Sequence, residues 1–331
     1  MAKNATTSPR IAFLGYGACF LAGCLWGTGF YWGRLALNEM SVEYMVLYRF
    51  LFASLGMLPV AFIHRRSFRL SIAETRLLLL CAFLGVPLQF LLQFHGLART
   101  TVSHACLMVG AMPVLLAAAA ALFAPKGSKA ERLDLIGWLA LFASTAGAVL
   151  LALGGNRSHA ARGEPSLIGD LLVVVSLFVA LAWILLSKKL MQTHSPPVVT
   201  AYTILSGTVM LVVWVLGPLL LTPFVSPSAR ANVAPLPFAH VSLTAWIALA
   251  ISGLLCTATT TLLWNWGIHH VPASRAGVFL NIEPALGSWL GVQLLGEHLG
   301  PYAWAGGGLI LAAAITLTTR GRRPEPAIIL E

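Results

Sequence analysis

Residues 84–123 read LGVPLQFLLQFHGLARTTVSHACLMVGAMPVLLAAAAALF, and residues 255–294 read LCTATTTLLWNWGIHHVPASRAGVFLNIEPALGSWLGVQL. The two stretches carry the same scaffold residues at a fixed separation of 171: Gly96 with Gly267, Ser103 with Ser274, Ala105 with Ala276, and Pro113 with Pro284. A matched glycine or proline marks a place where backbone geometry or close helix approach matters, so these matches indicate an internal repeat.

The chain around this repeat is strongly apolar. Its 331 residues are 58% hydrophobic and 10% charged, with a mean hydropathy of +0.83. A water-soluble domain needs a more polar surface than this composition provides, so the sequence predicts an all-α integral membrane protein. Runs of about twenty apolar residues, enough to cross a bilayer core, predict ten spans: 11–33, 43–63, 76–97, 101–124, 134–154, 167–187, 198–222, 243–267, 272–295 and 301–319.

Lys and Arg collect in alternate loops, which by the positive-inside rule predicts that both termini lie in the cytoplasm. Five spans per half is an odd number, so the second half starts on the opposite side of the membrane and the repeats are inverted. We expect a first repeat at 1–154, a loop at 155–166, a second repeat at 167–319 and a cytoplasmic tail at 320–331.

Several classes of function are disfavoured by this sequence. The basic residues lie in short loops without interleaved aromatic residues, so we expect no nucleic-acid partner. The five cysteines fall inside apolar runs without a CxxC pair, which predicts neither a metal site nor a cofactor. Phosphate-binding loops and the HExxH and GxSxG patterns are missing from the sequence, which argues against an ATP-driven pump and against an enzyme.

Polar residues inside the apolar runs indicate a candidate site. Thr257, Thr260, Thr261 and Trp264 follow helical spacing and so share one face, and the same face of the other repeat contains Gln89 and Gln93. Inverted symmetry would bring the two polar stripes together around a substrate cavity. The alternative is that these groups only bond to neighbouring helices or back to the backbone.

Two prolines and one carboxylate inside the predicted spans are further candidate functional residues. Pro113 and Pro284 occupy matched positions and serve either as hinges or as static kinks. Glu283 is the one carboxylate placed well inside a predicted span, and its roles are a structural ion pair, proton coupling or contact with a substrate ammonium group. Arg49 is expected to reach outward to the membrane interface or to pair within the bundle rather than to bind substrate. His104 is expected to be a polar residue at a helix end.

Aromatic residues gather near the predicted cavity, among them Trp26, Trp183, Trp264 and Phe279. Rings together with a few amides and hydroxyls suit small amphipathic solutes better than inorganic ions.

The order of several short motifs resembles the EamA-type branch of the drug/metabolite transporter superfamily. The motifs are Leu25-Trp26-Gly27, Arg49-Phe50, the segment from Gly96 to Pro113, Gly169-Asp170, Glu283-Pro284 and Leu295-Gly296-Glu297. One departure is that Ala124-Pro125-Lys126 of the first half does not repeat the acidic end of the second. The resemblance implies an inner-membrane carrier, often an exporter, for amino acids, related metabolites or drugs.

The sequence therefore predicts a secondary transporter of the bacterial inner membrane that moves a small organic solute by alternating access. Transport is expected to be driven either by protons or by the gradient of the solute itself, and monomer and homodimer are both open. The predicted substrate-binding residues are Trp26, Gln89, Gln93, Thr260, Thr261, Trp264 and Phe279, with Glu283 as the coupling or pairing carboxylate. The competing hypothesis is a non-transporting membrane sensor or assembly subunit.

Overall fold

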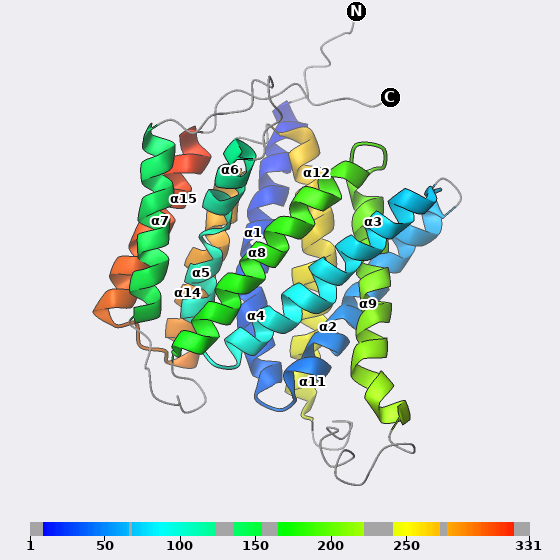
Figure 1. The fold of residues 1–331 in the computed structure, drawn as a ribbon, viewed down its shortest axis with the longest axis horizontal. Coiled ribbons are helices and arrows are strands. Elements are labelled where there is room, and N and C mark those ends of the chain that lie inside the picture. Colours follow the sequence, from blue (N-terminus) through cyan, green and yellow to red (C-terminus); the bar gives the residue numbers. More distant parts are fainter. Residues whose placement is uncertain are drawn as a thin grey trace, which may run out of the picture.

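The computed structural model describes residues 9–65, 68–122, 135–153, 165–221, 241–271 and 277–320 (Figure 1). The helices of the first half are α1 Pro9–Leu37, α2 Val42–His64, α3 Ile72–Phe83, the π-helix η1 Leu84–Leu88, α4 Gln89–Leu97, α5 Val102–Val109, α6 Met112–Leu122 and α7 Leu135–Leu153. Those of the second half are α8 Leu167–Leu190, α9 Pro196–Leu221, α11 Leu243–Ala250, the π-helix η4 Ile251–Thr259, α12 Thr260–His270, the 3₁₀-helix η5 Gly277–Asn281, α14 Ile282–Leu295 and α15 Pro301–Arg320. Most of the predicted loop at 155–166 and of the tail at 320–331 lies outside the described residues.

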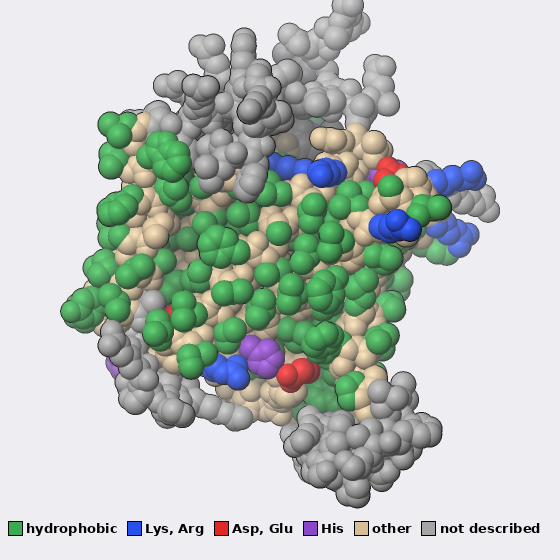
Figure 2. All heavy atoms as spheres, viewed as in Figure 1, with side chains coloured by type: hydrophobic (Ala, Val, Ile, Leu, Met, Phe, Trp, Pro, Cys, Tyr) green, Lys and Arg blue, Asp and Glu red, His purple; other side chains and the backbone are tan. Residues whose placement is uncertain are grey.

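The fold is all-helical over the part of the chain that the structure describes, as the composition predicts. Seven stretches are long and apolar enough to cross a membrane: Arg10–Leu37, Val42–His64, Ile72–Leu97, Val102–Ala119, Leu167–Leu190, Pro196–Pro218 and Leu243–Ile268. Two shorter apolar helices cover Leu135–Leu151 and Pro301–Leu317. Figure 2 shows hydrophobic side chains across the middle of the visible face, with charged side chains and histidine near its upper and lower edges. An apolar belt of this kind matches a bilayer.

The first helices of the two halves run in opposite directions. In Figure 1, α1 begins at the upper end of the molecule and descends, whereas α8 begins at the lower end and rises toward α9. The last helix, α15, returns to the upper end at which α1 begins (Figure 1).

A π-helical segment interrupts the corresponding helix in each half. Segments η1 and η4 end at Leu88 and Thr259, which are separated by the repeat offset of 171. Pro87 lies inside η1 and lacks the N–H of a regular helical turn. In η4 the Thr257 hydroxyl donates to the Ser252 carbonyl five residues earlier, at 2.9 Å. Wide turns of this type are frequent at functional sites, which directs attention to these two segments.

A second matched irregularity lies at the prolines. Helix α5 gives way to α6 around Gly110, and η5 gives way to α14 after Asn281. Pro113 is the second residue of α6 and Pro284 is the third residue of α14. Each proline therefore occupies a first helical turn, where its missing N–H costs little. The prolines begin new helical segments after a break, a geometry compatible with both the hinge and the static interpretation.

The matched glycines lie where helices of different halves cross. A β-carbon on Gly96 of α4 would lie 2.9 Å from the backbone nitrogen of Val173 in α8. A β-carbon on Gly267 of α12 would lie 3.1 Å from the Gly15 carbonyl oxygen in α1. The third predicted span of each half thus packs closely on the first predicted span of the other, and this close approach requires glycine.

Serines at the same offset begin the matched helices. Ser71 caps α3 in a capping box with Glu74, and a Glu74 carboxylate oxygen lies 3.3 Å from His194 Nε2 beyond α8. Ser242 caps α11 and donates through its hydroxyl and its backbone N–H to Glu39 beyond α1, at 2.6 Å each. The Ser242 hydroxyl and then its backbone N–H hold the pKa of Glu39 below its ordinary value. A carboxylate therefore connects the two halves at each end of the molecule.

The glycine crossing gives a first test. Replacing Gly96 with Leu should separate α4 from α8 and lower the melting temperature of purified protein by several degrees, because overpacking a tight contact costs about 1–3 kcal/mol. Gly217→Leu is the control, since a β-carbon on Gly217 would meet nothing within 4 Å. Equal melting temperatures for the two variants would show that the crossing does not depend on glycine.

Candidate functional site

A buried arginine lies at the centre of the candidate site. Arg49 of α2 is 6% exposed, and its Nε and Nη2 atoms each lie 3.2 Å from Thr257 Oγ1 in η4. The expected outward reach of Arg49 to the interface is therefore wrong: its side chain bonds within the bundle, to a neutral hydroxyl. Thr257 lies within the π-helical segment η4, which packs against α2.

Two aromatic rings cover the same guanidinium. The Arg49 Cζ atom lies 5.2 Å from the ring centroids of both Phe90 and Phe94 in α4. These two rings stack on each other at 6.2 Å, and Phe94 stacks on Phe30 of α1 at the same distance. A cation above aromatic faces gains some compensation for lost hydration, though less than a carboxylate would supply.

The charge of Arg49 lacks a direct ionic partner. Of the residues that the structure describes, none forms an ion pair with Arg49; the ion pairs found there all involve histidine. Glu283 of α14 interacts with Arg49 electrostatically but is not within ion-pair distance. Of the three roles considered for Glu283, a closed structural salt bridge to Arg49 is therefore the one that the geometry does not support.

The hydroxyls of the predicted threonine stripe donate to backbone carbonyls of their own helix. Thr260 is fully buried and donates to the Leu255 carbonyl at 2.6 Å, while Thr261 donates to the Thr257 carbonyl at 2.7 Å. The expected regular helical spacing from Thr257 onward is wrong, because η4 covers Thr257 and widens the turn before Thr260. Sequence spacing could not show this, since a π segment has no simple residue signature.

Gln89 and Trp183 each present a buried polar atom without a partner among the described residues. Gln93 is buried, and Gln89 one turn earlier has a buried Oε1 atom without a hydrogen-bond partner among the described residues. The Trp183 Nε1 atom of α8 is likewise buried and without a partner there. Trp183 packs beside Gly85 in η1, where a β-carbon would lie 2.7 Å from Nε1. Buried polar atoms without partners are costly, so such atoms are candidates for ligand contact.

The remaining predicted residues form an aromatic group around α1. Trp26 lies 5.5 Å from Trp264 of α12, measured between ring centroids. Phe279 of η5 lies 6.2 Å from Tyr16 and 6.4 Å from Phe20. The structure thus brings Trp26 together with Trp264 and places Phe279 against α1. Among the described residues, no hydrogen bond or ring contact joins the two glutamines to Thr260 or Thr261.

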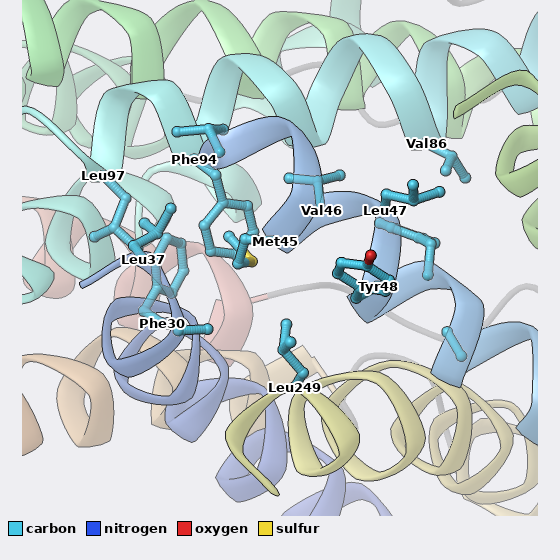
Figure 3. Close-up of a cluster of buried hydrophobic side chains, with 14 of the residues drawn as sticks. Phe30, Leu37, Met45, Val46, Leu47, Tyr48, Val86, Phe94, Leu97 and Leu249 are labelled. Atoms are coloured by element: carbon cyan, nitrogen blue, oxygen red, sulfur yellow. The ribbon is translucent and has the colours of Figure 1, made fainter. Parts of the chain in front are cut away.

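A cavity of about 550 Å³ lies toward the lower end, near the connection between α1 and α2. Its polar lining comprises Arg34, Asn38, Ser41, Glu43, His95, Arg99 and Glu297. None of the predicted substrate-binding residues lines it. Its lining residues Leu37 and Met40 belong to a buried apolar cluster that also includes Phe30, Met45 and Phe94, and Figure 3 shows part of this cluster.

Sequence reasoning missed a buried polar cluster between the halves. Asp170 of α8 accepts a hydrogen bond from the Thr100 hydroxyl at 2.5 Å, and its other oxygen lies 3.2 Å from His104 Nδ1 in α5. His104 is 1% exposed, so it is not merely a polar residue at a helix end. The Gly169-Asp170 motif was the one sequence signal for this cluster. It could not reveal the partners of Asp170, because Thr100 and His104 are distant from it in the chain.

Comparisons with known proteins agree with this architecture. The model of the EamA-like transporter family matches residues 13–153 and again residues 167–319. The chain belongs to the EamA-like transporter family.

Relatives of this EamA-like protein carry transporter names. An uncharacterized transporter of Archaeoglobus fulgidus is 26% identical over 89% of this chain and 93% of its own length. The uncharacterized inner membrane transporter YedA of Escherichia coli K12 is 25% identical over 94% of this chain and 92% of its own length. A protein of known crystal structure aligns with a TM-score of 0.58 and 17% identity, over 95% of this chain and 99% of that chain. That last similarity shows the fold alone.

Family membership confirms the resemblance found in the sequence. The EamA-like chain is a multi-pass inner membrane transporter with two copies of the family repeat. Such a protein acts on a small molecule within a membrane, and its relatives are named as transporters rather than as enzymes.

The buried Asp170 cluster should contribute more to stability than an exposed ion pair. Asp170→Asn puts an amide donor against either Thr100 or His104, and we expect the free energy of unfolding to fall by about 2 kcal/mol or more. Glu43→Gln is the control, because the Glu43–His95 pair is 39% and 34% exposed and such pairs contribute about 1 kcal/mol or less. Denaturant titration of both variants measures the difference, and equal losses would contradict a stabilising role for the cluster.

Proposed function

We propose that this EamA-like protein is a secondary transporter that exports small amphipathic metabolites, such as amino acids, by alternating access. In this proposal ten helices cross the membrane with both termini in the cytoplasm. Residues 1–154 and 167–319 form two inverted repeats of five helices each. The absence of a phosphate-binding loop in the sequence favours an ion or solute gradient as the energy source.

The inverted arrangement is supported by matched irregularities. The π segments η1 and η4 end at positions that the repeat offset relates, and the α5–α6 and η5–α14 breaks fall together in the same way. The opposite directions of α1 and α8 in Figure 1 agree with an inverted relation. Two similar halves that can exchange conformations provide the physical basis of alternating access.

The buried guanidinium of Arg49 is the observation that carries the proposal. It lies between the π segment η4 and helix α4, bonded to Thr257 and covered by Phe90, and its charge has no ionic partner among the described residues. Charged groups at this depth are costly and mark solute pathways by default. The unpartnered atoms of Gln89 and Trp183 add polar groups that a solute could satisfy.

We assign the solute-binding residues accordingly. Trp26, Gln89, Gln93, Thr260, Thr261, Trp264 and Phe279 contribute to the site, and Pro113 and Pro284 begin the segments that move. The cavity near the α1–α2 connection serves as an outer vestibule, on the side that the positive-inside rule places away from the cytoplasm. The apolar cluster of Figure 3 closes the path from this vestibule to the site.

Flux through reconstituted protein tests the function directly. Proteoliposomes loaded with a mixture of amino acids and related metabolites should release specific solutes faster than protein-free vesicles, as measured by mass spectrometry. Gln93→Leu should slow this release about three- to tenfold, since a lost hydrogen bond costs about 0.5–1.5 kcal/mol. Gln293→Leu is the matched control at an exposed position of α14. Folded protein that releases no solute would favour a sensor or assembly subunit.

Glu283→Gln tests proton coupling. If the Glu283 carboxylate carries the coupled proton, flux through the wild type should depend on an imposed pH gradient, whereas the amide variant should lose that dependence because it cannot exchange a proton. Initial rates are compared with and without the gradient. An unchanged dependence in the variant would assign the coupling to another group.

A further inference from the structure

We propose that Arg49 is the anchor for a carboxylate group of the transported solute, so that the substrate class is small amphipathic carboxylates, including amino acids. This inference rests on the proposed transport function and assigns its central contact.

The hydrogen-bonding capacity of Arg49 is only partly used. A guanidinium group offers five N–H donors in a planar fork. In the structure, Nε and Nη2 of Arg49 both point to one acceptor, Thr257 Oγ1, at 3.2 Å. The Nη1 atom forms no hydrogen bond with any residue that the structure describes. At least two N–H donors of the charged guanidinium therefore lack an acceptor among the described residues of this apolar bundle.

The groups that contact Arg49 are neutral and do not neutralise its positive charge. Thr257 supplies a neutral hydroxyl that is itself committed to the Ser252 carbonyl at 2.9 Å. The rings of Phe90 and Phe94 compensate in part through their faces. A desolvated charge with such partners is stabilised much less than one with a bidentate carboxylate, so a bound carboxylate would gain a full ionic contact.

The residues that face the guanidinium from α1 and α4 are small or apolar. Gly29 of α1 faces Arg49, and a β-carbon there would lie 3.7 Å from Nη2 and 3.6 Å from the Cys256 β-carbon. The helix opposite Nη2 thus presents a residue without a side chain. The flanking Phe90 and Phe94 rings offer apolar surface to the body of the same solute. Phosphate groups and dianions are less suitable, because Glu283 lies within electrostatic range of the site.

Comparing carboxylic acids with the corresponding primary amides tests whether binding requires a carboxylate group. Purified full-length protein is titrated with 4-methylpentanoate, phenylacetate and leucine, and with the corresponding primary amides, while its melting temperature is recorded. We expect the acids to stabilise the wild type and the amides to have little effect. In Arg49→Gln the half-saturating concentration of each acid should rise at least about tenfold, the loss expected for a charge-assisted contact.

Arg65→Gln is the control. Arg65 follows the same helix and also lies over an aromatic ring, 4.0 Å from the Phe62 centroid, but it is exposed at the helix end. Acid binding should be unchanged in this variant. An equal loss in Arg65→Gln and Arg49→Gln would attribute the effect to net charge and overturn the proposal, as would equal responses of the wild type to acids and amides.

Arg49→Lys decides the question if Arg49→Gln does not fold. Lysine retains the charge but not the planar fork, so acid binding should weaken about tenfold while the amide response stays the same. Wild-type acid affinity in Arg49→Lys would contradict anchoring by the fork. If the protein transports cationic or neutral solutes but its melting temperature does not respond to acids, the carboxylate anchor is rejected and the transport function stands. If no solute is transported at all, the proposed function is rejected as well.

Discussion

Close helix crossing between the two halves is the constraint on which the rest of the structure depends. The α4 backbone meets α8 at Gly96, and the α12 backbone meets α1 at Gly267. In a membrane, helices gain little from the hydrophobic effect on packing together, so close van der Waals contact between backbones provides much of the association energy. These crossings interlock the halves, and in each half a π segment directly precedes the crossing helix, η1 before α4 and η4 before α12.

The interlocked halves place a polar centre in an apolar protein. Arg49 reaches Thr257 from α2, and its faces are covered by rings from α4. A cluster around Asp170 satisfies a second set of buried polar groups nearer the lower end. The two centres differ in completeness: both Asp170 oxygens have partners, whereas the charge of Arg49 has no ionic partner among the described residues. A satisfied cluster stabilises a fold, and an unsatisfied charge is available for a ligand.

Much of the fold could be predicted from composition and from the offset of 171. The matched Gly96 and Gly267 lie at matched crossings, and Pro113 and Pro284 lie in matched helix starts. The site was less predictable. Its polar residues were identified as a set, but regular helical spacing misplaced Thr257, and the burial of Arg49 depends on a threonine 208 positions away. Contacts of that kind leave no local pattern in a single sequence.

The sequence by itself determined the apolar composition, the repeat and the residues at which helices must break or approach closely, because these properties depend on local backbone chemistry and on the length of apolar runs. Only the tertiary structure decided which polar groups find partners. The hydroxyls of Thr260 and Thr261 are bonded to backbone carbonyls, while Arg49 keeps N–H donors that have no partner among the described residues. The physical reason is that hydrogen-bond satisfaction inside a bundle depends on the register between helices that are distant in the chain, and a π segment changes that register.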